Sequence, residues 1–412
     1  MSLGRAALAA YRLGGWAAAP LAPRHLAARA ARGKEDSARM DEKRGRPSRA
    51  SGGRPVWIHA VSVGEAGVAM TLAGALRADG HEILITTSTP ASAERVAASP
   101  FPHQYAPLDA PPFVDRFLAH WRPLVGLFVE AEVWPTTLHR LAAAKIARVH
   151  VNARLSARSF GRWSRLLPVA RALFPLIDLA LCQSAADAAR FAALGTQAVE
   201  TGNIKFDAPA PVADPAAVAA LREALGDRPV WLAASLHPGE TAAVANAHRT
   251  IVAACPRAVT IAMPRHMATA EALAADGAEL ATARRSAGDP IADGTFYIAD
   301  TFGEMGTFLA LAPVVFLGGS LVPLGGHNPA EPAAFGAELL TGPSHGPMFA
   351  PFLASGAAVV ADGAALGEAV LSRLSDGGPR GASRQTLAAQ RGALDRTLLH
   401  LRPILARARA AA

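Results

Sequence analysis

Two series of short apolar segments, each alternating with helical patterns, constrain the fold of this chain more than any other feature. The segments lie at 56–61, 82–87, 125–130, 148–153, 179–184 and 198–202, and again at 230–234, 258–263, 295–299, 314–317, 338–341 and 358–361. Short apolar strands separated by helices are typical of parallel sheets covered by helices on both faces. The sequence therefore predicts an α/β protein with two doubly wound, Rossmann-like domains.

The length of 412 residues suits this organisation, because two domains of roughly 200 residues are expected for such a chain. We place the first domain at 55–207 and the second at 208–382. A last amphipathic helix within 383–412 is expected to cross back to the first domain. Ligands of doubly wound sheets bind beyond the carboxyl ends of the strands, so the two domains are expected to face a central cleft.

The net charge of +8 comes from the first 54 residues. They hold 12 of the 41 Lys and Arg and 4 of the 33 Asp and Glu, which leaves 29 of each sign in the rest of the chain. Because positive and negative charges balance in residues 55–412, nucleic-acid binding across the fold is not expected. The basic leader, residues 1–54, favours local contact with an anionic surface.

Two interpretations of this leader remain open. Residues 8–31 are too polar for a membrane-spanning helix, which needs about 20 apolar residues, and no credible signal-peptide cleavage site precedes the first domain. The segment is either a frayed basic extension or an amphipathic anchor on the cytoplasmic face of a membrane. In the second case four arginines would face lipid headgroups: Arg12, Arg24, Arg29 and Arg32. Residues 33–54 have the composition of a charged linker.

The two cysteines, Cys182 and Cys255, form no CxxC pair, so we expect a reducing cytosol and no disulfide. The histidines show no metal-binding spacing either, and no metal is predicted.

Polar residues follow the strands of the first domain. Glu65 stands where a glycine turn meets a helix, which suits either a general base or a glutamate that stabilises the helix start. Glu130 ends the third apolar segment and Glu132 comes two residues later, so we expect the two carboxylates to share one face of the strand end. Clustered carboxylates raise one another's pKa. Lys205 lies near the end of the predicted first domain. It is either a surface lysine or a cation that stabilises a departing phosphate.

The second domain repeats this pattern. Ser235 and the N–H groups after it suit a phosphate, and Arg265 follows the next strand as a bidentate phosphate ligand. The stretch 317–332, LGGSLVPLGGHNPAEP, indicates a strand, a glycine loop that lets a ligand approach, and a helix start that favours an anion. We interpret it as half of a nucleotide site.

Taken together, these motifs resemble the 3-deoxy-D-manno-octulosonic acid (Kdo) transferases of lipopolysaccharide assembly. The matching motifs are VSVGE at 61–65, ExExWP at 130–135, NARLSARS at 152–159, GNIKFD at 202–207, PRH at 264–266 and GGSLVPLGGHNPAEP at 318–332. The resemblance implies a GT-B glycosyltransferase that moves Kdo from CMP-Kdo to the lipid IV-A precursor, with inversion, on the cytoplasmic face of the bacterial inner membrane. It implies no metal and no other cofactor. The first 54 residues are less apolar than the membrane anchors of this family, so peripheral attachment fits better than a spanning helix.

The resemblance also implies roles for individual residues. Glu65 matches the general base, and Glu130 and Lys205 match positions that stabilise the transition state. The matches to the CMP-binding segments are Pro264, Arg265, Gly303, Glu304, Met305, Asn328, Pro329, Ala330 and Glu331. Ser235 and Glu132 remain candidates for phosphate or acceptor contacts.

Two alternatives remain. Another GT-B transferase using a UDP-sugar would be protected by UDP and not by CMP. An inactive GT-B scaffold would bind lipid or proteins without transfer, although intact Glu65, Lys205, Arg265 and Glu331 favour an enzyme.

Overall fold

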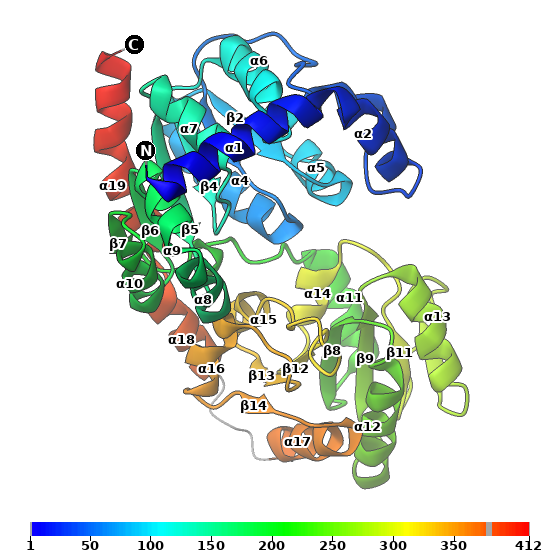
Figure 1. Ribbon diagram of the computed structural model, residues 1–412. Helices are drawn as coiled ribbons and strands as arrows, with labels where there is room; N and C mark the ends of the chain where they lie inside the picture. The colour runs from blue at the N-terminus through cyan, green and yellow to red at the C-terminus, as the bar shows by residue number, and fades with distance from the viewer. Residues whose placement is uncertain (1, 376–380, 412) are drawn as a thin grey trace. The chain divides into compact units, whose positions relative to one another are not determined.

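The computed structural model describes residues 2–375 and 381–411. Contacts divide the chain into two compact units, which are unit 1 (Met1–Ala208 with Arg391–Ala412) and unit 2 (Pro209–Gln390). Within the described residues each unit contains a seven-stranded parallel sheet flanked by helices (Figure 1). The predicted α/β class with two doubly wound sheets is therefore confirmed.

The sheet of unit 1 has the order β3-β2-β1-β4-β5-β6-β7. Its strands are β1 Val56–His59, β2 Ile83–Thr87, β3 His103–Tyr105, β4 Val125–Val129, β5 Ala147–Ala153, β6 Leu179–Cys182 and β7 Ala198–Glu200. Because strand side chains alternate between faces, β1 places Val56 and Ile58 in one apolar cluster and Trp57 in another. Both faces are thus buried, as expected for a parallel sheet.

Helices cover both faces of this sheet. They are α1 Leu3–Ala18, α2 Ala22–Ala30, α3 Met40–Lys43, α4 Val63–Ala78, α5 Pro90–Ala97, α6 Pro111–Trp121, α7 Pro135–Ala143, α8 Ala157–Arg165, α9 Leu167–Leu173, α10 Ala185–Ala193 and α19 Ala393–Ala410. Leu72 of α4 and Leu401 of α19 belong to the same cluster as Ile58. Leu8 of α1 belongs to the cluster on the other face, with Trp57.

Unit 2 repeats the architecture with the order β10-β11-β9-β8-β12-β13-β14. Its strands are β8 Val230–Leu236, β9 Val259–Pro264, β10 Thr282–Arg284, β11 Phe296–Ile298, β12 Val314–Leu317, β13 Glu338–Thr341 and β14 Ala358–Val359. Its helices are α11 Pro215–Leu225, α12 Thr241–Ala254, α13 Met267–Asp276, α14 Met305–Leu309, α15 Ala330–Phe335, α16 Ala350–Leu353, α17 Gly363–Ser375 and α18 Ala382–Gln390.

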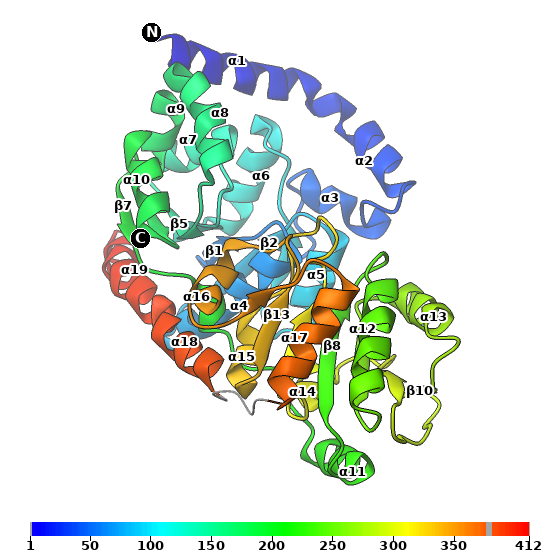
Figure 2. The same cartoon turned by 90° about the horizontal axis from the view of Figure 1, so that it is seen from below.

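Helices α12 and α17 lie side by side (Figures 1 and 2). A Cβ on Gly363 would come within 2.4 Å of the Ala243 carbonyl oxygen, and one on Gly367 within 2.8 Å of Thr250 Cβ. Glycine at these two positions therefore permits the close approach of the two helices.

The expectation of six strands per domain is wrong. In each sheet the additional strand is an edge strand of three residues, β3 in unit 1 and β10 in unit 2. His103 and Gln104 in β3, and Arg284 in β10, give these segments no apolar run. An edge strand has a neighbour on one side only, so its sequence need not follow the apolar pattern of the central strands.

The interpretation of residues 33–54 as a linker is also corrected. Glu35, Glu42 and Lys43 in this segment are buried. Lys43 forms an ion pair with Glu35 and donates to the Ser88 carbonyl at 2.8 Å, and Glu42 accepts from the Tyr105 backbone N–H at 2.8 Å. The segment is therefore an integral part of unit 1.

The expected single helix from 383 to 410 is divided into α18 and α19, because Gly392 adopts φ 91° between them. Asp207 fixes the start of α19, since its carboxylate accepts from the backbone N–H groups of Gly392 and Leu394 at 2.7 and 2.6 Å. Helix α19 packs within unit 1, whereas α18 belongs to unit 2. The predicted domain 208–382 includes residues 376–380, which lie outside the described residues.

Candidate functional site

Glu65 lies in the first turn of α4, directly beyond the carboxyl end of β1. Its Oε2 accepts from the Val61 N–H at 2.8 Å and its Oε1 accepts from the Ser62 hydroxyl at 2.9 Å. Ser62 in turn caps the helix by accepting from the Glu65 N–H at 3.3 Å. Glu65 therefore stabilises the helix start, as one of the two interpretations states, and the same bonds fix the orientation of its carboxylate.

The pKa of Glu65 is raised, mainly by burial. The hydrogen bonds from Val61 and Ser62 lower it, and the charges of Glu130 and Glu132 raise it. The pKa of Glu65 is thus shifted in the expected direction, but burial raises it more than the neighbouring carboxylates do. A carboxylate with a raised pKa is a stronger base near neutral pH.

Lys205 and Glu130 form an ion pair at the same edge of the sheet. Lys205 Nζ donates to Glu130 Oε1 at 2.6 Å, and the two side chains are 27% and 18% exposed. A Cβ on Gly64 would lie 3.8 Å from Lys205 Nζ, so the ammonium also lies beside the first turn of α4. The structure thus brings the three predicted catalytic residues together.

The backbone around this ion pair is unusual. Glu130 follows β4 with φ 59°, and Asn152 at the end of β5 has φ 50°. Asn152 Oδ1 accepts from the Ile204 N–H at 2.9 Å, which fixes the short turn that carries Lys205. Left-handed backbone in residues other than glycine costs of order 1–3 kcal/mol and is concentrated at functional sites. No pattern in the sequence predicts this role of Asn152, although its motif is part of the resemblance.

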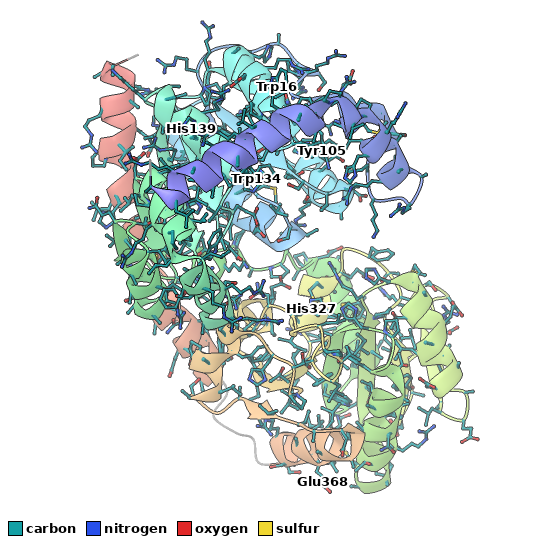
Figure 3. All side chains as sticks on the ribbon, in the orientation of Figure 1. Trp16, Tyr105, Trp134, His139, His327 and Glu368 are labelled. Atoms are coloured by element: carbon teal, nitrogen blue, oxygen red, sulfur yellow. The ribbon has the colours of Figure 1, made fainter. Side chains whose placement is uncertain are left out.

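Glu132 lies in the turn after Glu130, so the two carboxylates are not on one strand face as expected. Trp134, labelled in Figure 3, donates its indole N–H to Glu132 Oε2 at 2.7 Å. The pKa of Glu132 is raised by burial and then by Glu130, and is lowered by the Trp134 hydrogen bond. Glu132 therefore interacts electrostatically with both Glu130 and Glu65.

In unit 2 the predicted donor residues lie at or beyond the carboxyl ends of three strands, β9, β11 and β12. Arg265 follows β9 and is exposed, and its backbone N–H donates to the Leu236 carbonyl at 2.8 Å. Gly303, with φ 85°, and Met305 flank Glu304 at the start of α14. The Glu304 carboxylate already accepts from Arg285 at 2.7 and 3.1 Å, which lowers its pKa. Its side chain is thus engaged within unit 2.

The loop after β12 leads to the remaining donor candidates. Asn328 Oδ1 accepts from the Ala330 N–H at 3.0 Å and so fixes the start of α15. Pro329 and Ala330 are buried, while Pro264 and Glu331 are half-buried. Glu331 lies in the first turn of α15.

Several backbone N–H groups of the glycine loop are already hydrogen-bonded within unit 2. The carboxylate of Glu240, which is fully buried, accepts from the backbone N–H groups of Gly319, Ser320 and Leu321 at 2.7, 3.0 and 2.9 Å. It also accepts from the His237 N–H at 3.0 Å. Later in the loop, Gly325 N–H donates to the Ser344 hydroxyl and Gly326 N–H to the Gly319 carbonyl.

The predicted phosphate role of the turn at Ser235 is weakened for the same reason. Ser235 is buried with φ 58° at a break in the β8–β9 register, and the His237 N–H after it is bound to Glu240. A negative charge that binds here must therefore be recognised mainly by side chains.

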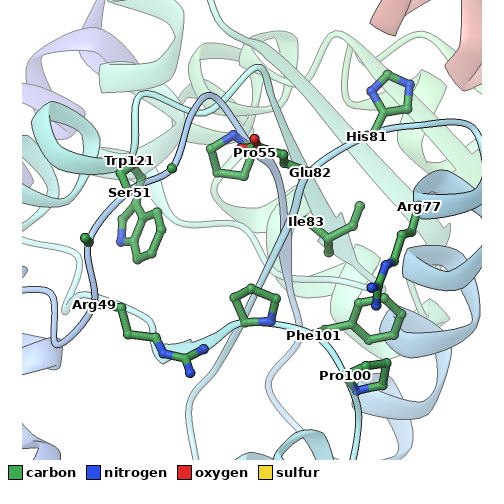
Figure 4. Close-up of a pocket in the computed structure, with 13 residues that line it drawn as sticks. Arg49, Ser51, Pro55, Arg77, His81, Glu82, Ile83, Pro100, Phe101 and Trp121 are labelled. Carbon is green, nitrogen blue, oxygen red and sulfur yellow. The ribbon is translucent and has the colours of Figure 1, made fainter.

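Unit 1 also contains a pocket of about 660 Å³ at the opposite edge of its sheet (Figure 4). Pro55, Glu82 and Pro102, which line it, precede β1, β2 and β3. Arg77 extends over the Phe101 ring there at 6.0 Å from the ring centroid. None of the predicted site residues lines this pocket.

Residues 2–375 and 381–411 contain no group of three or more His, Cys, Asp or Glu side chains placed to hold a metal ion. Across the same residues no helix combines the length and apolar character needed to cross a bilayer.

Comparison with known proteins gives one family. The family model described as 3-deoxy-D-manno-octulosonic-acid transferase (kdotransferase) matches residues 38–208. A probable mitochondrial 3-deoxy-D-manno-octulosonic acid transferase of Arabidopsis thaliana is 33% identical over 83% of this chain and 81% of its own length. The 3-deoxy-D-manno-octulosonic acid transferase of Haemophilus influenzae is 35% identical over 70% of each chain. That of Bordetella pertussis is 37% identical over 70% of this chain and 71% of its own.

Solved structures agree on the fold. The S. aureus MnaA–UDP structure covers 84% of this chain and 96% of its own at 14% identity and a TM-score of 0.59. A glycosyltransferase from Rickettsia africae covers 86% and 99% at 12% identity and a TM-score of 0.57. The C-terminal CMP-Kdo binding domain of WaaA from Acinetobacter baumannii, at 28% identity, covers 43% of this chain and 95% of its own with a TM-score of 0.37. The two sheets and the first two of these structures, with TM-scores above 0.5, identify a GT-B type fold.

Proposed function

The chain belongs to the Kdo transferase family, and on that premise we propose that it moves Kdo from CMP-Kdo to the lipid IV-A precursor with inversion at the anomeric carbon. Family membership makes it a glycosyltransferase, and the proposal concerns the donor, the acceptor and the residues. The observation that carries it is the gathering of Glu65, Glu130 and Lys205 at the carboxyl edge of the unit 1 sheet.

We assign the general base to Glu65. An acceptor hydroxyl must lose its proton as its oxygen attacks the anomeric carbon, and a carboxylate with a raised pKa accepts that proton near neutral pH. The bonds from Val61 and Ser62 hold the carboxylate in one orientation, so little reorganisation is needed before the proton is transferred.

Lys205 and Glu130 act together in this proposal. Breaking the donor's glycosidic bond leaves negative charge on the departing phosphate, and an ammonium held in place by Glu130 stabilises it. The pairing matters because a free lysine side chain would lose rotamer entropy when it is brought into position.

Donor binding is assigned to unit 2 and acceptor activation to unit 1. The proposed donor residues are Pro264, Arg265, Gly303, Glu304, Met305, Asn328, Pro329, Ala330 and Glu331. Since Glu240 occupies the loop N–H groups, Arg265 is the clearest phosphate ligand among them. No metal or other cofactor is part of the proposal, and the cleft expected between the domains stays a prediction.

We also propose peripheral attachment to the cytoplasmic face of the inner membrane through α1. Leu8 of this helix is buried against unit 1, whereas Leu3, Leu13 and Trp16 are 74%, 71% and 66% exposed. Leu13 and Trp16 are three residues apart and so lie on one face of the helix, and Trp16 is labelled in Figure 3. An exposed apolar face next to basic residues suits insertion at the level of lipid headgroups.

The four arginines of the first 54 residues that were expected to face lipid headgroups differ in their exposure to solvent. Arg24 and Arg32 are exposed. Arg29 is bound to Glu35 at 2.6 Å and Arg12 is half-buried, so not all four predicted arginines are equally free to meet lipid. The apolar face of α1 therefore contributes more to the proposed attachment than the sequence suggests.

Nucleotide binding tests the donor assignment. Titration calorimetry with CMP and with UDP at equal concentrations should give a dissociation constant at least tenfold lower for CMP. Preference for UDP would instead favour a transferase that uses a UDP-sugar and would contradict the proposed donor. Arg265→Ala should weaken CMP binding, and Arg249→Ala on the outer helix α12 is the matched control.

A further inference from the structure

Two histidines are hydrogen-bonded to each other at the carboxyl edge of the unit 2 sheet. His237 follows β8 and His327 lies in the loop after β12, and their Nε2 atoms are 2.8 Å apart. The rings are within 10° of parallel, and His266 meets His237 edge-on at 5.8 Å between ring centroids. His327 is labelled in Figure 3. We call His237 and His327 the imidazole pair.

The glycine loop supports this pair rather than a ligand. Gly319 has φ 69°, and a Cβ there would lie 3.3 Å from His327 Cδ2 and 3.4 Å from His237 Cδ2. Glu240 binds both the Gly319 N–H and the His237 N–H, so one buried carboxylate fixes the loop and the first imidazole together. The position of the pair is therefore determined by the fold of unit 2.

A hydrogen bond between two imidazole nitrogens needs one N–H and one free lone pair. The pair in this geometry thus carries either no charge or one positive charge, and never two. A change between these two states moves one proton and leaves the hydrogen bond in place.

Burial, more than the surrounding charges, favours the neutral state of the pair. The groups that act on the pair are Arg265, His266 and Glu240. Burial, followed by His237, Arg265 and His266, lowers the pKa of His327 to about 4. Burial also lowers the pKa of His237, although Glu240 opposes this. His345, from the loop after β13, lies near Gly326, and its Nδ1 is 3.0 Å from the Gly342 carbonyl oxygen.

An anion next to Arg265 would oppose this preference for the neutral state. Its negative charge offsets the guanidinium and favours the charged state of the imidazoles. The loop N–H groups that would otherwise bind an anion are bound to Glu240. Side chains must then supply the positive charge, and the imidazole pair can gain one.

We propose that the imidazole pair takes up one proton when the phosphate of the donor nucleotide binds beside Arg265. The charged pair then faces the phosphate monoester that forms when the glycosidic bond of the donor breaks, which carries one more negative charge than the diester. His237 and His327 are positioning residues for the leaving nucleotide in this scheme. This inference rests on the proposed donor, and the experiment below separates the two.

Calorimetry of CMP binding to the full chain tests the inference. At pH 7.5 to 8.5 CMP is already a dianion, because the second pKa of a phosphate monoester is about 6, so it contributes no proton itself. Titrations in two buffers of different ionisation enthalpy, Tris and HEPES, give the number of protons taken up. We expect uptake approaching one proton per CMP, and a dissociation constant that rises by up to about tenfold for each pH unit.

Two variants identify the group responsible. His327→Gln and His237→Gln should each abolish the uptake and flatten the pH dependence, and agreement between them guards against a folding defect in either one. His25→Gln, at an exposed position of α2, is the matched control and should retain the uptake.

Three results would overturn the inference. They are equal heats in both buffers after dilution correction, full uptake in both variants, or no binding of CMP, UDP and inorganic phosphate alike. If UDP bound with proton uptake while CMP did not bind, the imidazole pair would be upheld and the proposed donor would be wrong.

Discussion

Lys205 Nζ lies 2.6 Å from Glu130 Oε1, although the two residues are 75 positions apart in the sequence. Glu130 reaches this position from a left-handed backbone after β4, and Lys205 from a short turn fixed by Asn152. Neither partner is fully buried, so the ion pair alone contributes little to stability. Its consequence is geometric, because it places a cation beside the helix start that carries Glu65.

Removing this cation should impair catalysis more than folding. We expect Lys205→Met to lower kcat by about 10²-fold or more, as for other lost electrostatic contacts to a transition state. A double-mutant cycle with Glu130→Gln should give a coupling in kcat of about 0.5–3 kcal/mol, since the two side chains touch. Independent effects of the two substitutions would contradict a joint role. Lys145→Met, on a turn outside the site, is the control.

Glu65→Gln separates the two interpretations of this residue. Glutamine retains an oxygen that can accept from the Val61 N–H, so the helix start should survive, whereas the base is lost. We expect kcat to fall by about 10²–10⁴-fold with CMP affinity unchanged. Glu94→Gln, exposed on α5, should behave as wild type. Wild-type turnover by Glu65→Gln would leave Glu65 a structural residue only.

The pH dependence of kcat/KM should reveal the raised pKa of Glu65. The base acts only when deprotonated, so activity should fall as pH drops through a pKa above the usual glutamate range. Glu132→Gln removes one neighbouring charge and should move this acid limb to lower pH. The shift should be modest, because burial is the larger cause. An acid limb that Glu132→Gln moves upward would contradict the electrostatic account.

Glu240 should be important for the stability of unit 2. Its carboxylate accepts four backbone N–H groups, and the amide of Glu240→Gln would turn a donor toward some of them. We expect a loss of about 2–4 kcal/mol in unfolding free energy, measured by urea denaturation. Glu271→Gln, at a side chain that is 68% exposed, should change stability by less than about 0.5 kcal/mol. Equal stability of both variants would show that the loop does not depend on Glu240.

Membrane attachment should depend on the outward face of α1. Leu13→Asp and Trp16→Asp should each reduce cosedimentation with vesicles containing anionic phospholipid, because a charged side chain opposes insertion at the interface. Leu399→Asp on α19 is the matched control, since Leu399 is 69% exposed and Leu13 is 71% exposed. Equal losses for Leu13→Asp and Leu399→Asp would argue against a specific anchoring face.

The sequence predicts the central strands well, because strands such as β4 and β12 are buried on both faces and so form continuous apolar runs. The edge strands β3 and β10 contain no continuous apolar run, so this pattern does not predict them. The strand pattern also predicts that Glu65 and Lys205 lie beyond strand ends. Because the strands of a parallel sheet run in one direction, these ends meet at one edge.

Contacts between residues far apart in the sequence could not be predicted from it. Nothing in the sequence near residue 240 indicates that Glu240 binds a loop about 80 residues later and so occupies backbone N–H groups of that loop. The left-handed backbone at Glu130 and Ser235 is equally hidden, because side chains of this kind rarely adopt positive φ. The imidazole pair joins two loops 90 residues apart in the sequence and has no local signal.

The most direct test of the proposed function is the mass of the product formed from CMP-Kdo and lipid IV-A. The wild-type chain should convert lipid IV-A to a species heavier by one or more Kdo units and release CMP, and Glu65→Gln should form about 10²–10⁴-fold less product in the same time. Unchanged lipid IV-A in the presence of folded, CMP-binding protein would contradict the proposed acceptor. Equal product from wild type and Glu65→Gln would contradict the proposed base.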